Sequence, residues 1–481
     1  MDLRWRDGDS EARFSAYMNY LSDCLGHADR VGPFRSYCTG LLLPGERKSV
    51  EPMAARLRPD RTSAEHQSLL HFVGQSCWDE TALLRSVREA VFPVMTERHP
   101  VEAWIVDDTG FPKKGRHSVG VGRQYCGQLG KQDNCKVAVS LSVAICQASL
   151  PVAWQLYLPE AWAEDAGCRK TAKVPDEIGF LTKPEISLGQ IRSALADGIA
   201  PGVVLADAGY GNSADFRDGL DDLGLAFVVG VMGKSTVWPP GMKPTVPAGT
   251  GRGRVPKRLR RGGDDAPTVQ VQALVGRLPA EAWQSVTWRE GVAQQLTSRF
   301  VALRVRPAQG DHRRSEPRCE QWLLAEWPQD EAEPTSFWFS TLPADTPIER
   351  LVYMAKLRWL IERDYLELKQ ELGLGHYEGR GWRGFHHHCA LCIAAYGFLV
   401  AERAAIPPSA AKTTRLVKTT ELPADYRPRG SANPHRATCD SLDRNPAKTD
   451  RTSSGEKPAS MPVLYKHQPI PIQRNKQLMT Q

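Results

Sequence analysis

The chain has 481 residues, of which 41% are hydrophobic and 24% charged, and its formal net charge is +7 at pH 7. This length exceeds one ordinary domain, so we expect two or three, and the globular composition excludes wholesale disorder. The N-terminus is charged where a signal peptide would be apolar, and no run approaches the roughly 18 apolar residues of a membrane span. These features predict an intracellular protein without a membrane partner.

The positive charge is concentrated at the C-terminal end. Residues 406–481 contain 13 Lys and Arg against six Asp and Glu, so this segment accounts for the whole net charge. Its content of Pro, Thr, Ser and Lys, with little apolar periodicity, predicts a disordered basic tail. The net charge is therefore weak evidence about the function of the rest of the chain.

The eleven cysteines are scattered and odd in number, which is typical of reduced thiols rather than of a disulfide framework. The segment HHHCALC at 386–392 superficially offers zinc ligands, but no second Cys-x-x-Cys accompanies it. The segment also continues as an apolar helical pattern, in which Cys389 and Cys392 fall on a buried stripe. We therefore favour packing over zinc binding for these residues.

Residues 1–98 have the spacing of helices. Apolar residues recur at intervals of three and four in the segments 13–25, 68–76 and 80–95. A basic turn at 44–48 lies between these helices, and it either contacts DNA or is a solvated loop. We interpret residues 1–98 as an N-terminal helical domain that binds DNA.

The pattern changes to strands in residues 99–231. Apolar runs at 101–108, 136–146 and 151–159 predict three strands, and the short turn between the last two favours antiparallel pairing. A helix, a strand ending at Asp207, a second helix and a fifth strand follow. This order is that of the ribonuclease-H-like fold, an α/β fold with a mixed sheet flanked by helices. Residues 99–231 are thus predicted to form the first part of such a core.

Residues 232–343 depart from this core. A Gly- and Pro-rich basic stretch is followed by short strand-like runs separated by turn residues, which predicts an inserted β-strand subdomain. Residues 344–405 return to helical spacing, with one long helix from about 346 to 372 and another near 383–405. We assign 344–405 to the C-terminal helical part of the core.

Two strands that are neighbours in the ribonuclease-H-like fold are each predicted to end in an acidic residue. Asp107 or Asp108 ends the first strand and Asp207 ends the fourth, and these strands lie side by side and parallel. A third acid would complete a site for two Mg²⁺ ions, which prefer oxygen ligands and serve phosphoryl transfer when carboxylates converge on them. The sequence therefore raises the hypothesis of a two-metal site at this edge of the sheet.

The late helix supplies the third acid. Arg358, Glu362 and Lys369 are four and seven residues apart, so they share one helical face. A carboxylate between two cations suits a metal on one side and a DNA phosphate on the other. Ordinary salt bridges on a solvated helix are the alternative, and Glu367 and Glu371 are rival acids on other faces.

Four segments in order, VDDTGFPKKG, YCGQLGKQDNCKVAVSLS, LADAGYG and RWLIERDYLELK, resemble the DDE transposases of bacterial insertion sequences, in the branch with a β-strand insertion between the second Asp and the Glu. The resemblance covers roughly residues 30–405. It implies a metal-dependent polynucleotidyl transferase that cuts transposon ends and joins the 3′-hydroxyl to target DNA. Two Mg²⁺ ions, replaceable by Mn²⁺, would be its cofactors.

The resemblance also implies partners and a location. Double-stranded DNA, as terminal inverted repeats and as target, would be bound by a homodimer in the bacterial cytoplasm, at the nucleoid. The catalytic and metal-binding acids fall on Asp107, with Asp108 as the alternative, on Asp207 and on Glu362. The basic helix positions of the family fall on Arg358 and Lys369. A Tyr common three residues before that Arg is replaced by Ala355.

Further basic residues are expected to bind DNA phosphates. Lys113 and Lys114 follow the first acid. The insertion carries a basic run, with a solvated loop as the alternative interpretation, made of Arg252, Arg254, Lys257, Arg258, Arg260 and Arg261. The glycine pairs at 120–122 and 127–130 lack a following helix, so they are interpreted as turns rather than as a nucleotide-binding loop.

Two other functions use the same residues. One is a non-catalytic DNA-binding protein derived from a transposase, although the presence of all three acids argues against it. The other is a two-metal nuclease that cuts DNA without strand transfer, which only the joining of ends to a target distinguishes from a transposase.

Overall fold

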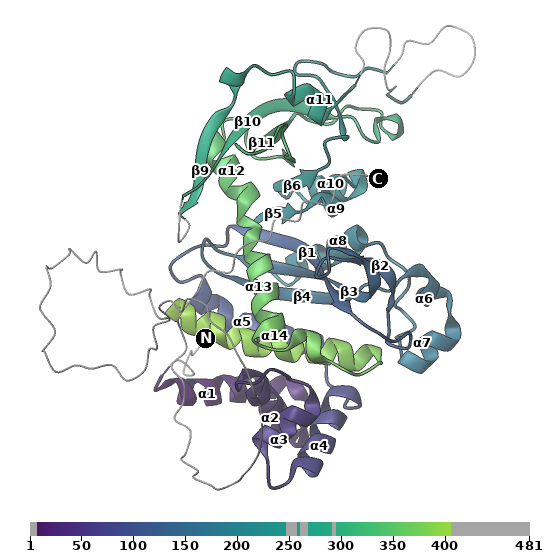
Figure 1. Cartoon of the computed structure of the whole chain (residues 1–481), viewed down its shortest axis with the longest axis vertical. Coiled ribbons are helices and arrows are strands. Elements are labelled where there is room, and N and C mark those ends of the chain that lie inside the picture. Colours follow the sequence, from purple (N-terminus) through teal and green to yellow (C-terminus); the bar gives the residue numbers. More distant parts are fainter. Residues whose placement is uncertain (1–6, 247–256, 260–267, 291–294, 406–481) are drawn as a thin grey trace, which may run out of the picture. The chain divides into compact units, whose positions relative to one another are not determined.

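The structure, a computed structural model, describes residues 7–246, 257–259, 268–290 and 295–405 (Figure 1). Proximity of Cα atoms groups the chain into residues 1–407 and 408–481. The second unit lies outside the described residues, and so does the tail predicted at 406–481. All described helices and strands belong to the first unit.

The N-terminal part of the chain is helical. Its elements are α1 (Ser10–Ser22), α2 (Val31–Leu42), α3 (Val50–Leu57), α4 (Thr62–Gly74) and α5 (Glu80–Met95), with 3-10 turns at Asp23–Leu25 and Ala28–Arg30. Helix α5 begins where the sequence predicts, because the Asp79 carboxylate accepts the backbone N–H groups of Thr81 and Ala82. Helices α2, α4 and α5 pack on α14 (Trp382–Ala405), so the N-terminal helices share one hydrophobic core with the end of the described chain.

A mixed sheet forms the centre of the fold. Its core strands are β1 (Ala103–Pro112), β3 (Lys131–Ala144), β4 (Ser149–Leu156), β5 (Val203–Ala206) and β6 (Phe227–Val231). They lie in the order β4-β3-β1-β5-β6, with β3 antiparallel to β1 and β4, and with β5 parallel to β1 and β6. The predicted ribonuclease-H-like fold is therefore confirmed.

Helices cover both faces of this sheet (Figure 1). Ile105 points to the face covered by α5 and the late helices, whereas Trp104 and Val106 point to the face covered by α8 (Lys183–Ala196) and α10 (Ala214–Asp222). This alternation follows from the two-residue period of a strand. Three shorter helices complete the core: α6 (Glu160–Glu164), α7 (Ala166–Ala172) and α9 (Ala208–Gly211).

The sequence pattern missed one strand. Strand β2 (Gly122–Cys126) pairs antiparallel with the start of β3 and forms a hairpin with it. The turn between them contains Gly130 at φ +63°, a left-handed conformation that glycine adopts at little cost. The glycines at 127–130 are thus part of a turn, and the polar composition of β2 explains why no strand was predicted there.

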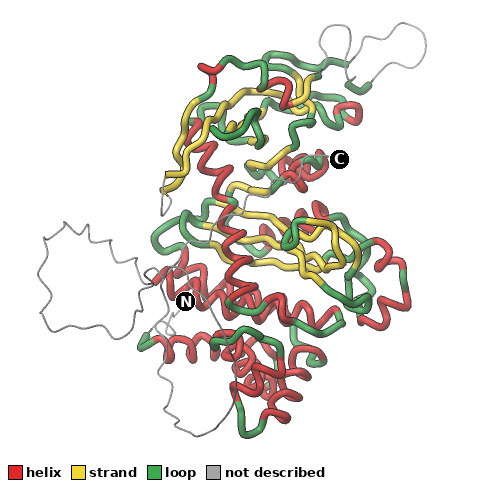
Figure 2. The backbone as a smooth tube through the Cα atoms, in the orientation of Figure 1, coloured by secondary structure: helices red, strands yellow, loops and turns green. Residues whose placement is uncertain are grey.

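The insertion continues the core sheet rather than forming a separate one. Strand β12 (Ser336–Ser340) pairs antiparallel with β6, which gives a 12-stranded sheet within the described residues (Figure 2). The other elements of the insertion are β7 (Thr236–Trp238), β8 (Val269–Gln270), α11 (Val271–Val275), β9 (Gln284–Glu290), β10 (Gln295–Pro307), β11 (Gln321–Trp327) and 3-10 turns at Ala280–Ala282 and Asp311–Arg313.

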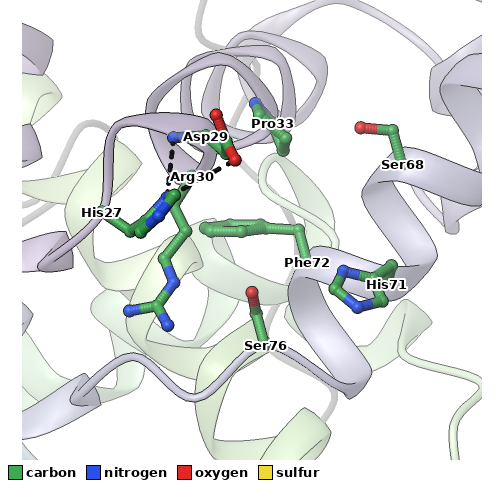
Figure 3. A pocket seen from close by; sticks show the side chains of 8 residues that line it. All are labelled: His27, Asp29, Arg30, Pro33, Ser68, His71, Phe72 and Ser76. Carbon is green, nitrogen blue, oxygen red and sulfur yellow. Dashed lines mark hydrogen bonds and ion pairs between the residues drawn. The ribbon is translucent and has the colours of Figure 1, made fainter.

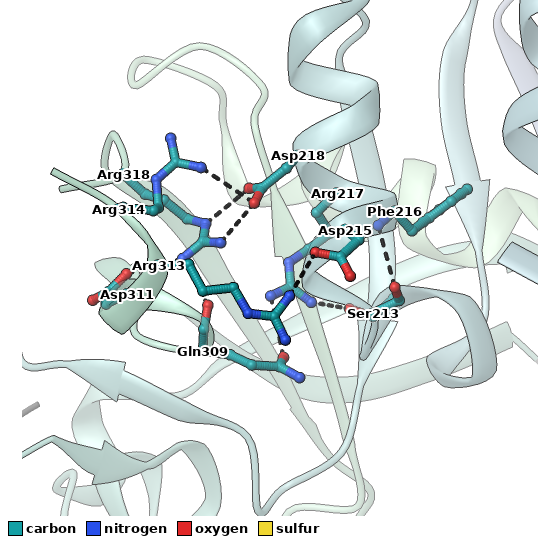
Figure 4. A network of polar contacts seen from close by, with 11 residues as sticks. Ser213, Asp215, Phe216, Arg217, Asp218, Gln309, Asp311, Arg313, Arg314 and Arg318 are labelled. Carbon is teal, nitrogen blue, oxygen red and sulfur yellow. Dashed lines mark hydrogen bonds and ion pairs between the residues drawn. The ribbon is translucent and has the colours of Figure 1, made fainter. Parts of the chain in front are cut away.

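Ion pairs also hold the insertion to helix α10 (Figure 4). Arg318, only 3% exposed, donates to both carboxylate oxygens of Asp218 at 2.9 and 2.8 Å and to Asp311 at 2.9 Å. Arg313 reaches Asp215 at 3.4 Å. A buried, bidentate arginine–carboxylate pair is stronger than exposed ion pairs. The insertion and the core are therefore joined by polar contacts as well as by the sheet.

The long helix predicted at 346–372 is two helices. Helix α12 (Ile348–Leu357) packs on β6, β9 and β10, and helix α13 (Trp359–Gln370) packs on β1 and β4. At the junction the backbone tightens, because the N–H of Ile361 donates to the carbonyl of Arg358 three residues back. The break occurs where the chain passes from the insertion to the core, a change of packing partner that helical periodicity does not reveal.

Helix α14 is long and apolar enough, by length and composition, to cross a membrane. Its 18-residue window has a mean hydropathy of 1.2, but 94% of that window is buried inside the fold. The histidines of its HHHC segment bond to neighbouring polar groups: His386 Nε2 accepts the N–H of Leu156, and His388 Nδ1 lies 2.9 Å from the Tyr37 hydroxyl. The helix thus has the surroundings of a core helix.

Candidate functional site

Strands β1 and β5 bring two of the predicted acids to one edge of the sheet. The parallel register pairs Ile105 with Leu205, so Asp107 and Asp207 occupy equivalent positions two residues further along. Asp207 directly follows β5 and begins α9, where its carboxylate accepts the N–H of Gly209 at 2.8 Å. The register thus makes the two carboxylates neighbours, and the Asp207 charge contributes to the raised pKa of Asp107.

Arg358 connects the first acid to the third. Its Nη1 donates to Asp107 Oδ2 at 2.7 Å, and its Nη2 donates to Glu362 Oε1 at 2.6 Å. Burial lowers the pKa of Arg358, but the charges of Asp107, Glu362 and Asp207 together outweigh burial, so the pKa is raised overall. One guanidinium thus bridges two of the three predicted acids, at the junction of α12 and α13, and the charge of the third also acts on it.

The environment of the acids differs. The Asp107 side chain is 13% exposed and that of Glu362 is 60% exposed. Burial raises the pKa of Asp107 to about 7, although the Arg358 charge opposes this increase. Carboxylates that are brought together out of water repel each other and favour a cation or a proton between them. The site is therefore suited to binding positive charge.

Asp108 faces the opposite side of the sheet from Asp107. Its Oδ2 pairs with Lys183 at 2.9 Å, and its Oδ1 accepts from the Tyr210 hydroxyl at 3.3 Å. Lys183 is held there by the start of α8, where Thr182 and Glu185 cap each other reciprocally. Two acids adjacent in sequence thus have separate partners, and only Asp107 contacts the arginine next to Glu362.

Sequence reasoning did not assign Lys183 or Tyr210 to this site. Tyr210 belongs to the LADAGYG segment, which offered a signal for it, but Lys183 lies in a stretch with no motif. Tyr365, on the same helical face as Arg358, bonds the Ser140 hydroxyl at 2.7 Å, opposite Asp107 in the β1–β3 register. Lys183 and Tyr210 thus satisfy Asp108 on one face of the sheet, whereas Tyr365 lies on the Asp107 side.

Neither rival acid on the late helix has the contact that Glu362 makes. Glu367 Oε2 accepts from Arg403 of α14 at 2.6 Å. The backbone carbonyl of Glu371 accepts from the buried Lys48, so the end of α13 is tied to the N-terminal helices. Of the three glutamates, Glu362 contacts the arginine that also binds Asp107.

The predicted DNA-binding lysines near the acids are partly buried. Lys369 Nζ donates to the Gly110 carbonyl at 2.7 Å, and burial lowers its pKa to about 8. Lys113 Nζ donates to the Tyr377 carbonyl at 2.9 Å, whereas Lys114 is exposed. In the basic run of the insertion, Lys257 and Arg258 are exposed. The other four members, Arg252, Arg254, Arg260 and Arg261, lie outside the described residues.

A divalent cation would find an all-oxygen donor set in Asp107, Asp207 and Glu362, which suits Mg²⁺ or Mn²⁺. Within the described ranges, no three His, Cys, Asp or Glu side chains are close enough as they stand to hold an ion. Arg358 bridges two of the acids instead. The donors therefore fit such an ion chemically, provided that Arg358 moves away from them.

A separate cleft of about 420 Å³ lies among the N-terminal helices (Figure 3). Its lining comes from the turn before α2 and from α4, and includes His27, Arg30, His71 and Ser76 around Phe72. His27 also pairs with Asp29. None of the predicted site residues lines this cleft, so it is distinct from the acidic site.

Asp107 lies within β1, which continues to Pro112 beyond the predicted end, and Asp207 directly follows β5. The strand order and these neighbouring acids place the chain in the class of ribonuclease-H-like proteins with an acidic site on the sheet. A family model described as DDE superfamily endonuclease matches residues 20–295, which is more than half of the chain, and the chain belongs to this family. The matched residues include Asp107 and Asp207 and end before Glu362.

The chain is also similar to a curated protein, the probable transposase for insertion sequence element IS701 from Microchaete diplosiphon. The two are 32% identical over 199 residues, which is 41% of this chain and 48% of that protein. The match thus spans about half the length of this relative. Together with the family match, it confirms the resemblance to DDE transposases of insertion sequences.

Proposed function

We propose that the chain is a DNA transposase that cleaves the ends of an insertion sequence and joins them to target DNA. The observation that carries this proposal is that Arg358 bridges Asp107 and Glu362, while the parallel register of β1 and β5 places Asp207 level with Asp107 in a ribonuclease-H-like sheet. Membership in the DDE superfamily endonucleases supports it. The relative that is named a probable transposase supports the same activity.

Asp107, Asp207 and Glu362 would hold two divalent cations, Mg²⁺ or, in its place, Mn²⁺. When bound, such ions activate the attacking oxygen and stabilise the leaving oxygen of an in-line phosphoryl transfer. Asp107 is preferred over Asp108, because Asp108 faces away and is already paired with Lys183. Arg358 balances the charge of the acids as they stand, and its guanidinium can bind a DNA phosphate once it leaves them.

The DNA partner is proposed to be double-stranded, as terminal inverted repeats and as target. Arg358 contacts two of the acids, Lys369 bonds to Gly110 of β1, and Lys113 and Lys114 follow β1. Together these four residues would neutralise backbone phosphates. Because two ends must be cut, we expect a homodimer on DNA, acting at the nucleoid in the bacterial cytoplasm. The N-terminal helices and the basic run of the insertion would add further DNA contacts.

Substitution of the acids tests the activity. Asp107→Asn, Asp207→Asn and Glu362→Gln each remove a carboxylate, so cleavage of donor plasmid carrying the element's own ends should fall by at least about 10²-fold in Mg²⁺. Binding of the same DNA should remain. Asp108→Asn is the matched control, one residue away on the other face, and should retain more cleavage than Asp107→Asn. Full cleavage by any of the first three variants would contradict the assignment.

An endonuclease without strand transfer is the second candidate, because the matched family is described as one of endonucleases. It would use the same acids in the same positions. Incubation of pre-cleaved ends with a supercoiled target plasmid separates the two activities. Joined products establish the transposase, whereas cleavage without joining establishes the nuclease. DNA binding with neither reaction would instead favour the non-catalytic protein.

A further inference from the structure

The hairpin formed by β2 and β3, residues 122–131, has no role in the proposed two-metal chemistry. It is part of the YCGQLGKQDNC segment, and its strands pair from Gly122–Cys135 to Cys126–Lys131. Along β2 the side chains alternate, so Arg123 and Tyr125 point to solvent and Cys126 is buried. The hairpin thus presents one strand face and its turn to the outside.

Two large apolar side chains are exposed on this hairpin. Tyr125 is 44% exposed and Leu129, in the turn, is 41% exposed. A single exposed apolar residue is ordinary on a protein surface. Two of them four residues apart on one hairpin, next to basic side chains, are a less ordinary combination, and an aromatic ring in basic surroundings is the chemistry with which proteins bind unpaired bases.

The segment that contains β2 and the preceding loop is basic. Residues 109–132 contain five Lys and Arg and no Asp or Glu. Of these, Lys114, Arg116 and Arg123 are exposed. The first acid beyond them, Asp133, pairs with Lys131 at 3.2 Å. This distribution of charge complements a polyanion and not another basic or neutral surface.

The basic loop and the hairpin form one surface. The side-chain amide of Asn134 donates to the carbonyls of Lys113 at 2.5 Å and Gly115 at 3.0 Å, and the N–H of Lys113 donates back to the Asn134 carbonyl at 2.9 Å. These bonds hold the loop 113–116 against the start of β3. Lys114 and Arg116 therefore lie on the same rigid framework as Tyr125.

The hairpin is also held beside the acidic site. Lys369 Nζ donates to the Gly110 carbonyl and lies 3.4 Å from Gln128 Oε1, in the hairpin turn. Gly110, three residues beyond Asp107, packs so closely on the hairpin that a Cβ there would come within 2.8 Å of the Cys126 sulfur. The turn is thus fixed near Gly110 of β1, three residues beyond the first acid.

We propose that the hairpin 122–131 is a DNA-contacting element, in which Tyr125 and Leu129 pack on unpaired bases at a DNA end. Lys114, Arg116 and Arg123 bind the adjoining phosphates. Because the hairpin packs on β1 at Gly110, three residues beyond Asp107, it would hold the end of the strand close to the place where the backbone is cut or joined. This inference rests on the proposed function, since it assumes that DNA is the substrate of the acidic site.

The test measures binding of two DNA probes by fluorescence anisotropy. Both are duplexes of mixed sequence, about 30 base pairs long, and one of them ends in about four unpaired nucleotides. Tyr125→Ser with Leu129→Ser should weaken binding of the unpaired end about tenfold and change the blunt duplex little, because stacking on bases requires that they be unpaired. Tyr125→Trp should keep the affinity for the unpaired end.

The basic residues of this surface are tested by the salt dependence of DNA binding. The triple variant Lys114→Gln, Arg116→Gln, Arg123→Gln should weaken both probes and reduce the salt dependence of binding, by about one unit of slope for each phosphate that is no longer neutralised. Leu181→Ser, at a leucine 43% exposed outside this surface, is the control for removal of an exposed apolar side chain and should bind as the parent does. Thermal unfolding checks that each variant is folded.

The outcomes separate the two proposals. If the parent chain binds neither probe, the proposed function and the hairpin's role both fail. If the parent binds and the hairpin variants bind equally well, only the role of the hairpin is overturned. If the variants bind DNA normally but lose self-association in sedimentation, the hairpin contacts a second copy of the chain, which also overturns the proposal.

Discussion

At the scale of single residues, the central feature is a guanidinium among three carboxylates. Arg358 donates to Asp107 and Glu362, and the charge of Asp207 also raises its pKa. Carboxylates brought this close would repel each other, and a cation between them offsets that cost. The same charge distribution that holds Arg358 would attract divalent ions. The site thus has the electrostatic character that its proposed chemistry requires.

A glycine sets the position of the second acid. Helix α9, which Asp207 begins, packs so closely on β6 that a Cβ at Gly211 would overlap the carbonyl oxygen of Gly230. Gly211→Ala should therefore destabilise the fold by about 1–3 kcal/mol, because a strand backbone cannot easily yield. It should also lower cleavage by displacing Asp207. Urea denaturation and cleavage of donor DNA measure the two effects.

Gly189 provides the matched control for this substitution. It lies inside helix α8, and a Cβ there would meet nothing within 4 Å. Gly189→Ala should stabilise the protein by up to about 1 kcal/mol, since alanine has the higher helix propensity. Equal effects of the two substitutions would show that the close approach of α9 and β6 does not constrain the site.

At the scale of elements, α14 connects the N-terminal helices to the core sheet. It packs on α2, α4 and α5 on one side and on β4 on the other. His386 donates from Nδ1 to the Trp382 carbonyl and accepts at Nε2 from Leu156. His388 lies between the Tyr37 hydroxyl and the Gly373 carbonyl. Each ring thus has one donor and one acceptor, which is the pattern of a neutral imidazole.

These histidines make stability depend on pH. Burial lowers the pKa of His386 and of His388 from 6.5 to about 4. Between pH 6.5 and 4 the unfolded chain therefore binds protons that the folded chain does not, and stability falls as the pH falls through this window, by up to about 3 kcal/mol for each ring. Burial raises the pKa of Asp107 and of Asp364 to about 7, and these groups act in the opposite direction over the same range. The histidine contribution is therefore measured as a difference between variants in urea denaturation.

Substitution isolates the contribution of one ring. His386→Asn keeps a side-chain N–H but cannot be protonated, so its stability should fall less steeply with acid than that of the parent, even if it is lower at pH 7. His71→Asn, at an exposed histidine of α4, is the control and should leave the slope unchanged. Identical slopes for the parent and His386→Asn would contradict a role for burial of this ring.

At the scale of the whole described fold, the insertion and the core are one sheet. Strands β6 and β12 join them, and Lys356 of α12 adds a bidentate ion pair to Glu326 of β11 at 2.8 and 2.7 Å. The Lys356 ammonium also lies 4.5 Å from the centre of the Trp288 ring. Lys356 is two residues from Arg358. The insertion is thus connected to the helix junction that carries the acidic site.

Removal of this lysine should affect the whole molecule. Lys356→Met leaves the Glu326 carboxylate, 7% exposed, without its cation, which should cost about 3–5 kcal/mol. The double variant Lys356→Met, Glu326→Gln should recover part of the loss. Because the sheet is shared, urea should unfold the insertion and the core in one transition, followed by circular dichroism and by tryptophan fluorescence.

An exposed ion pair gives the matched control. Arg47 and Glu378 pair with side chains 68% and 60% exposed. Arg47→Met should change stability by less than about 1 kcal/mol, because water screens such pairs. If Lys356→Met were equally mild, or if the two optical signals separated, the insertion would be an independent unit in spite of the shared sheet.

Much of the fold could be predicted from local patterns. The strict alternation at 136–146 predicts β3, and the apolar runs ending at Asp108 and Asp207 correspond to β1 and β5, because a strand's two-residue period is a local property. Strand β2 was missed, since its polar residues carry no such signal. The break at Arg358 was missed as well, because both halves of the helix keep the same period.

The sequence by itself determined the class of fold, and strand order, helical spacing and the resemblance to DDE transposases predict the three acids. Only the tertiary structure decided that Arg358 lies between Asp107 and Glu362, that Asp108 turns away to Lys183, and that the insertion extends the core sheet. These contacts join residues that are distant in the chain. Periodicity describes which face of an element is apolar, but it does not specify which other element that face will meet.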